Sequence, residues 1–303
     1  MGAFKGPKDW GRLLTAMITP FDKDGGVNYA EVARIATYLV DQQKNDGLVV
    51  NGTTGESPTL EENEKLHILE TVLEAVGSKA AVIFGAGTYN TKESIHMARE
   101  ATRIGAHGIM LVNPYYNKPG QTGLQAHFEA VAAETSLPVM LYNIQPRSSI
   151  NLETPTLLKL AEKPNIVAVK EASGSLPQIS EVCAQAPNGF RVYSGDDALT
   201  LPILSVGGHG LVSVAAHVAG AELKALIEAF DTEPSESKRI HQRLLPLFKA
   251  LFAYPSPVPV KYALSMMGFD CRSVRLPLVE MGPQDAANVE QAMRALGKVG
   301  VAA

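Results

Sequence analysis

Eight short apolar runs recur along the chain, and this repetition constrains the fold more than any other feature. Nearly continuous apolar character over so few residues is typical of parallel strands that are covered on both faces. We therefore expect one strand from each run. The runs cover residues 13–19, 47–52, 80–87, 108–114, 138–143, 166–171, 190–195 and 210–214.

The stretches between the runs have helical periodicity. Apolar residues recur at spacings of three and four in 28–43 and 59–76, and the stretch 91–106 ends at Gly105, a residue typical of helix ends. Strands that alternate with helices eight times predict an α/β fold, the (β/α)8 or TIM barrel. The alternative is a doubly wound open sheet, which would usually show fewer strands and a glycine-rich first turn.

The last part of the chain carries no strand signal. The eighth strand–helix unit closes near residue 230, and helical patterns follow in 236–253, 257–268 and 283–300. The sequence therefore predicts two domains: a catalytic barrel over 1–235, and a C-terminal helical extension over 236–303 that packs on the barrel.

Composition excludes several classes of function. The 303 residues are 46% apolar, and their net charge of −4 comes without a basic block, so we expect no nucleic-acid partner. No apolar run approaches the roughly 18 residues that span a bilayer, so we expect no membrane association. Cys183 and Cys271 lie far apart, which favours a reducing cytoplasm over a disulfide scaffold. The histidines lack zinc-type spacing, so we expect no metal. No dinucleotide-binding fingerprint occurs either, so the sequence gives no sign of a nucleotide cofactor.

Lys170 is the strongest catalytic candidate. Barrel enzymes carry their chemistry at the carboxyl ends of the strands, and Lys170 directly follows the apolar residues 166–169. A lysine that loses hydration there has a lowered pKa and more free amine, as attack on a carbonyl requires. The alternative is a lysine whose ammonium group reaches solvent. Within a barrel, the position favours a nucleophile that forms a Schiff base.

Other strand ends supply groups that such a lysine needs. Tyr142 follows the fifth run and could shuttle protons, and Thr53 and Thr54 after the second run could hold a substrate carboxylate. Tyr115 and Tyr116 follow the fourth run, on a loop stiffened by proline. Each of these features alone is common in structural turns and packing, so their weight comes from the combination.

The combination resembles the dihydrodipicolinate synthase family of pyruvate-dependent aldolases, which also includes N-acetylneuraminate lyase. The resemblance runs over essentially the whole chain. It rests on "ITPFDKDGGVN", "GTTGESPTL", "PYYNKP", "YN" followed by Arg147, "VKEASG", "SGDD", "GGHGLVSV" and "PSPVPVKYAL".

The resemblance implies a role for each candidate. Lys170 would form the imine with pyruvate, so no cofactor is needed, and Tyr142 would shuttle protons with Thr53 and Tyr116. The second phenol of this relay would come from a neighbouring subunit, as in a homotetramer built from dimers. The substrate-binding residues would be Thr54 for the pyruvate carboxylate, Arg147 for the carboxylate of aspartate semialdehyde, and the backbone carbonyls of Gly195 and Val212.

The Arg147 loop departs from the pattern of the family. A guanidinium suits a substrate carboxylate, because it can hold one with two hydrogen bonds. The neuraminate lyases and sugar-acid aldolases of the family usually carry other residue types at this position, so the resemblance, with an arginine five residues after the tyrosine, favours the semialdehyde. Proline has moved by one place to Pro146, however, and Ser149 stands where the family has glycine. A serine there is costly if the position requires positive φ. The loop therefore leaves open another pyruvate-dependent aldolase, or a 2-keto-3-deoxy sugar-acid aldolase or dehydratase.

The resemblance also bears on regulation. Some members are inhibited by lysine through positions that match Ser57, Pro58, Glu62, Lys65, Tyr89, Glu93 and Tyr115. Lys65 and Tyr89 replace the histidine and asparagine of the inhibited enzymes. Because a cationic Lys65 repels a cationic effector, we expect a weak response to lysine.

The leading hypothesis is a lyase that condenses pyruvate with aspartate semialdehyde in diaminopimelate and lysine biosynthesis. A catalytically inactive barrel that acts as a sensor or interaction protein is the alternative from another class. Such a protein would be expected to lack Lys170 or Tyr142, and both are present.

Overall fold

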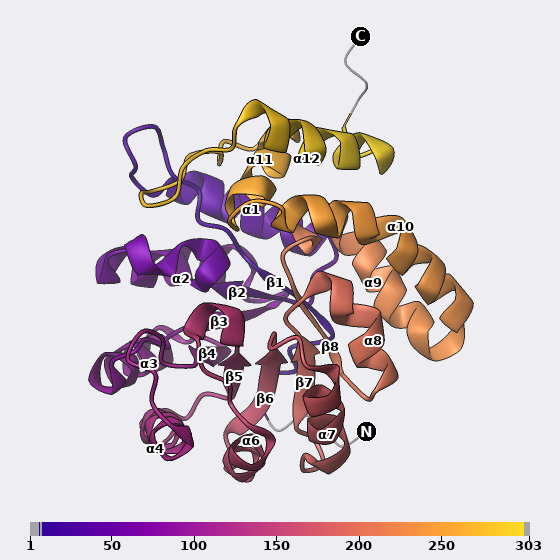
Figure 1. The fold of residues 1–303 in the computed structure, drawn as a ribbon. Helices are drawn as coiled ribbons and strands as arrows, with labels where there is room; N and C mark the ends of the chain where they lie inside the picture. Colours follow the sequence, from indigo (N-terminus) through magenta and orange to yellow (C-terminus); the bar gives the residue numbers. More distant parts are fainter. Residues whose placement is uncertain (1–5, 7, 300–303) are drawn as a thin grey trace. The chain divides into compact units, whose positions relative to one another are not determined.

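The chain folds as a closed eight-stranded barrel in which the strands follow their order in the sequence, β1 to β8 (Figure 1). The computed structural model describes residues 6 and 8–299. All eight strands that the apolar runs predict are present, and the open doubly wound sheet is excluded. They are β1 (Leu13–Ala16), β2 (Gly47–Val50), β3 (Ala81–Gly85), β4 (Gly108–Val112), β5 (Val139–Asn143), β6 (Ile166–Glu171), β7 (Arg191–Ser194) and β8 (Gly210–Ser213).

Helices follow the strands along the chain. The predicted helices over 28–43, 59–76 and 91–106 are confirmed with shorter ends, and Gly105 caps the third in the left-handed conformation at φ 96°. Short 3-10 turns cover Thr53–Gly55 (η1), Ser57–Thr59 (η2) and Asp197–Leu199 (η3). The helices are α1 (Tyr29–Asp41), α2 (Glu62–Val76), α3 (Thr91–Ile104), α4 (Gln121–Ala132), α5 (Gln145–Ser148), α6 (Thr154–Ala161), α7 (Leu176–Gln185), α8 (Thr200–Ser205) and α9 (Ala216–Thr232).

The C-terminal region is helical, as predicted. It contains α10 (Pro234–Phe252), α11 (Val258–Met266) and α12 (Pro283–Ala295). Helix α10 packs on α9, and α12, yellow in Figure 1, packs on α10 and α11. The domain boundary at residue 235 stays a prediction. The last residues of the predicted extension, 300–303, lie outside the described residues.

The chain divides into two compact units, which we describe separately. The first contains the residues up to Arg12 together with Ala81–Val212, and the second contains Leu13–Ala80 together with Ser213–Ala303. In the first unit, parallel pairing runs from β3 through each neighbour to β8. In the second, β1 pairs in parallel with β2.

Burial explains why the strands lack an alternating pattern. Residues on both faces are buried; all six residues of β6 are, for example. In the first unit, Trp10 is fully buried, and a Cβ on Gly108 would lie 2.3 Å from its Cζ2 atom. Glycine at the start of β4 therefore makes room for the indole.

Among the described residues, no helix is long and apolar enough to cross a membrane.

Candidate active site

Lys170 is the penultimate residue of β6, inside the first unit. Its neighbours in the strand register are Tyr142 on β5 and Tyr193 on β7. The Lys170 Nζ atom lies 4.2 Å from the centroid of the Tyr142 ring, and the two residues are only 5% and 4% exposed. The predicted nucleophile and the predicted proton carrier are thus in direct contact.

Burial makes the Lys170 amine unusually easy to deprotonate. Loss of hydration lowers the pKa of Lys170 from its ordinary 10.5 to about 7. Asp197 acts against this and raises the pKa, whereas the positive charge of Arg147 lowers it further. The Lys170 side chain therefore exists largely as the free amine at mildly alkaline pH.

Gly195 leaves the space that the lysine side chain occupies. It follows β7, and its N–H donates to the carbonyl of Glu171 at 2.7 Å. A Cβ on Gly195 would lie 3.0 Å from Lys170 Cε and 2.8 Å from Ala172 Cβ, closer than a side chain tolerates. Val212, the other residue predicted to present a carbonyl, lies on β8 and is 1% exposed.

Arg147 lies on α5, a single helical turn that the sequence did not predict. Pro146 stands in its first turn, where proline is tolerated, and the turn ends at Ser149. Ser149 has φ 62° and ψ 6°, and its N–H donates to the carbonyl of Gln145 at 2.8 Å. Position 149 therefore has the positive φ that would favour glycine, so serine carries a conformational cost here.

A buried polar network holds the segment after α5. Asn143, the last residue of β5, accepts from Asn113 Nδ2 at 2.9 Å and from the N–H of Leu152 at 2.9 Å. Its own Nδ2 donates to Asn151 at 2.8 Å and to Glu171 at 3.1 Å. Burial raises the pKa of the Glu171 carboxyl. The network thus ties the loop that carries Arg147 to the strand that carries Lys170.

The two tyrosines after β4 have different surroundings. Tyr115 is half-buried and packs edge-on against Tyr89, with ring centroids 5.2 Å apart, and burial raises its pKa. Tyr116 is 90% exposed and has φ 68°, so the backbone presents its phenol to solvent. Within this chain, Tyr115 is a packing residue and Tyr116 points outward.

Thr53 and Thr54 lie in the second unit, where η1 follows β2. Thr54 is buried and Thr53 is half-buried. The turn is closed by the N–H of Gly55, which donates to the carbonyl of Gly52 at 3.0 Å. The Thr19 hydroxyl donates to the carbonyl of Gly55 at 2.7 Å. The segment after β1 thus holds the turn that carries the two threonines.

Sequence reasoning missed the residues that support these groups. The polar network around Asn143 and Glu171 had no assigned role, nor did Glu56 and Lys261, which form a buried ion pair in the second unit. Glu56 and Lys261 lie within the motifs "GTTGESPTL" and "PSPVPVKYAL". Their place in these motifs was the one sequence signal that could have pointed to them.

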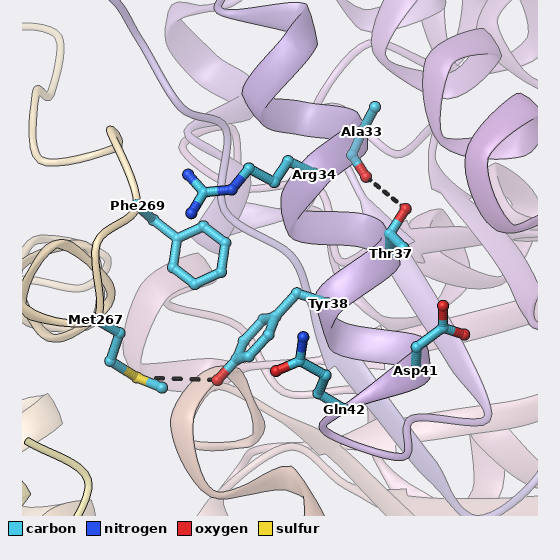
Figure 2. Close-up of a pocket in the computed structure, with 8 residues that line it drawn as sticks. All are labelled: Ala33, Arg34, Thr37, Tyr38, Asp41, Gln42, Met267 and Phe269. Carbon is cyan, nitrogen blue, oxygen red and sulfur yellow. Dashed lines mark hydrogen bonds between the residues drawn. The ribbon is translucent and has the colours of Figure 1, made fainter.

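A pocket of about 580 Å³ in the second unit contains none of the predicted site residues. It lies between α1 and the turn after α11 (Figure 2). There the Arg34 guanidinium lies 4.4 Å from the centroid of the Phe269 ring, and the Tyr38 hydroxyl contacts Met267 Sδ at 3.8 Å. The pocket therefore does not enter the candidate active site.

Comparison with protein families gives a match over nearly the whole chain. The model of the "Dihydrodipicolinate synthetase family" matches residues 9–296. A protein of Moorella thermoacetica named 4-hydroxy-tetrahydrodipicolinate synthase is 51% identical over 289 residues, which cover 95% of this chain and 99% of that protein. The protein of the same name from Bacillus subtilis is 50% identical over 275 residues, or 90% and 94% of the two chains.

Solved structures are equally similar. DHDPS from Cyanidioschyzon merolae with lysine bound superposes with a TM-score of 0.94 at 44% identity, over 96% of this chain and 99% of that one. Dihydrodipicolinate synthase from Aquifex aeolicus gives 0.92 at 38% identity, over 95% and 98%.

Proposed function

Because the chain belongs to the dihydrodipicolinate synthetase family, we propose that it is a lyase that condenses pyruvate with L-aspartate 4-semialdehyde. The product is 4-hydroxy-tetrahydrodipicolinate, and the reaction is the first committed step toward diaminopimelate and lysine. Relatives that are about half identical over nearly their full length carry the name of this activity.

The observation that carries the proposal is the buried Lys170 with a pKa of about 7. Its free amine attacks the pyruvate carbonyl to form a carbinolamine, which loses water to become an imine. Loss of a proton from the pyruvate methyl group then gives an enamine, whose carbon attacks the aldehyde of the second substrate. The amino group of that substrate finally displaces the lysine. The covalent imine on Lys170 thus takes the place of a cofactor or metal.

Each protonation step needs a nearby acid or base. Tyr142 is proposed for this role because its ring contacts the amine. Thr53 and Tyr116 complete the relay by their match to the family motif. Tyr116 would act in the site of a neighbouring subunit, which fits its 90% exposure in this chain. We therefore propose a homotetramer built from dimers.

The substrate carboxylates are assigned by residue type and motif. Thr54 would bind the carboxylate of pyruvate, and Arg147 that of the semialdehyde, because a guanidinium pairs with a carboxylate. The carbonyls of Gly195 and Val212 would face the ligand. The proposed partners are these two small-molecule substrates. We propose that the protein acts on them in the cytoplasm, without nucleic acid or membrane. The barrel, 1–235, would carry the chemistry, with 236–303 as its helical extension.

The initial rate with pyruvate and aspartate semialdehyde, coupled to the next reductase, tests this proposal. We expect a rate that the Lys170→Ala variant loses. If there is no rate but borohydride still traps pyruvate on Lys170, the imine chemistry stands and the second substrate is a different one. The alternative is then a different pyruvate-dependent aldolase or a sugar-acid aldolase or dehydratase, which the altered Arg147 loop with its Ser149 turn leaves open.

A further inference from the structure

A fully buried ion pair lies next to the predicted carboxylate-binding turn. Lys261 on α11 and Glu56 after η1 have side chains that are 0% and 1% exposed. Lys261 Nζ donates to Glu56 Oε1 and, at 2.7 Å, to the carbonyl of Ser273. The second carboxylate oxygen accepts the N–H of Arg275 at 3.1 Å. Each charge is therefore compensated, as burial of an ion requires.

Glu56 is part of the turn itself. Its N–H donates to the carbonyl of Thr53 at 3.1 Å, and it has φ 55° and ψ 35°, a left-handed conformation that is unfavourable for a residue other than glycine. Its carbonyl accepts from the N–H and the hydroxyl of Thr59, both at 3.0 Å. A residue in this conformation persists only when its surroundings hold it. The bond from Lys261 to the Glu56 carboxylate helps to hold the residue in this conformation.

The opposite side of the turn has no room for a side chain at Gly55. A Cβ on Gly55 would lie 3.1 Å from the carbonyl oxygen of Met17 and 3.3 Å from the Thr19 hydroxyl. The turn is thus pressed against the segment after β1 on one side and anchored to α11 through Glu56 on the other. Because the N–H of Glu56 is bonded to the carbonyl of Thr53, we expect a shift of Glu56 to move Thr53 and Thr54.

The cation is also fixed in place. Lys261 Nζ lies 4.3 Å from the centroid of the Phe21 ring, and the Arg275 guanidinium lies 4.4 Å from the same centroid. Arg275 in turn binds both oxygens of Glu64, at 2.7 and 2.5 Å. Since a buried ion pair is weak evidence for stability by itself, its position beside the turn suggests a different use.

We propose that Lys261 and Glu56 are positioning residues that hold the Thr53–Gly55 turn in the geometry that binds the substrate carboxylate. This inference rests on the proposed function. It gives the C-terminal helical region a role in the reaction, because α11 supplies the cation.

Steady-state kinetics of Lys261→Met and of the double variant Glu56→Gln/Lys261→Met test the inference. The single variant leaves a buried carboxylate without its cation and so lowers stability as well. The double variant removes both charges at nearly constant volume. We expect both variants to raise KM for pyruvate at least about tenfold, because Thr54 of the turn binds the carboxylate, and to lower kcat as well, because Thr53 of the same turn belongs to the proposed proton relay. KM for the semialdehyde should change less than about threefold, since Arg147 lies outside the turn. The thermal midpoint should recover in the double variant while KM stays raised.

Lys224→Met is the matched control. It makes the same substitution in the same unit and breaks the ion pairs of Lys224 with Asp46 and Glu228, which lie outside the Thr53–Gly55 turn. Its KM for pyruvate should match that of the wild type. A double variant with wild-type stability and wild-type KM overturns the positioning role and leaves the proposed function intact. A wild-type protein that neither turns over nor traps pyruvate overturns both.

Discussion

The rate at which pyruvate forms an imine on Lys170 should depend on pH with a midpoint near 7. The perturbation is pH itself, and the group that responds is the Lys170 amine, whose pKa burial lowers to about 7. The protonated amine cannot attack a carbonyl, and the carboxylate of pyruvate stays ionised throughout. The rate should therefore follow the fraction of free amine.

That fraction sets the size of the effect. With a pKa of about 7, about a tenth of the amine is free at about pH 6, half at about pH 7 and nine-tenths at about pH 8. An ordinary lysine at 10.5 would have only about 0.3% free at about pH 8. Imine formation should thus rise about ninefold between about pH 6 and 8 and then level off.

The assay separates imine formation from reduction. Protein and subsaturating pyruvate react for short times at each pH, and borohydride at one fixed pH then quenches every sample. Mass spectrometry of the peptide that contains Lys170 gives the labelled fraction. A rate that still rises tenfold for each pH unit above about pH 8 would show that Lys170 is not desolvated and refute the reasoning.

Three further predictions concern the loops. Arg147→Ala should lower kcat/KM for the semialdehyde about 10- to 100-fold, because hydrogen bonds to charged groups are worth about 1.5–3 kcal/mol. It should also move the midpoint of imine formation to higher pH, since Arg147 lowers the pKa of Lys170; unchanged values of both would contradict its role. Ser149→Gly should raise the free energy of unfolding in urea by about 0.5–1 kcal/mol, because position 149 has φ 62°, and an equal or lower value would show that the turn carries no strain. L-lysine should inhibit only weakly because Lys65 is cationic; inhibition at submillimolar lysine, measured beside Lys65→His, would rule this out.

The eight apolar runs predicted every strand but not where each ends. The run 13–19 is mostly apolar and buried, yet β1 ends at Ala16, and the N–H of Ile18 donates to His217 Nε2 instead of a neighbouring strand. In the run 47–52, Asn51 takes φ 57° and leaves the ladder. A run of apolar residues indicates burial, and burial continues past the last hydrogen bond of a strand.

The same limit applies to the candidate site. The position of Lys170 could be predicted because its apolar neighbours in the strand show its burial. The supporting residues could not, because Glu56 and Lys261 are 205 positions apart. A charge on one helix face resembles any solvated charge until its partner is known. The short helix α5 was missed for a related reason: "YNIQPRSS" gives one helical turn that no periodicity can show.

The central claim is that Lys170 is the residue that binds pyruvate covalently. Borohydride reduction of the protein with pyruvate, followed by peptide mapping, tests it most directly. The account predicts a single stoichiometric adduct on Lys170, absent from the Lys170→Ala variant. An adduct on another lysine, or turnover without any adduct, would contradict it.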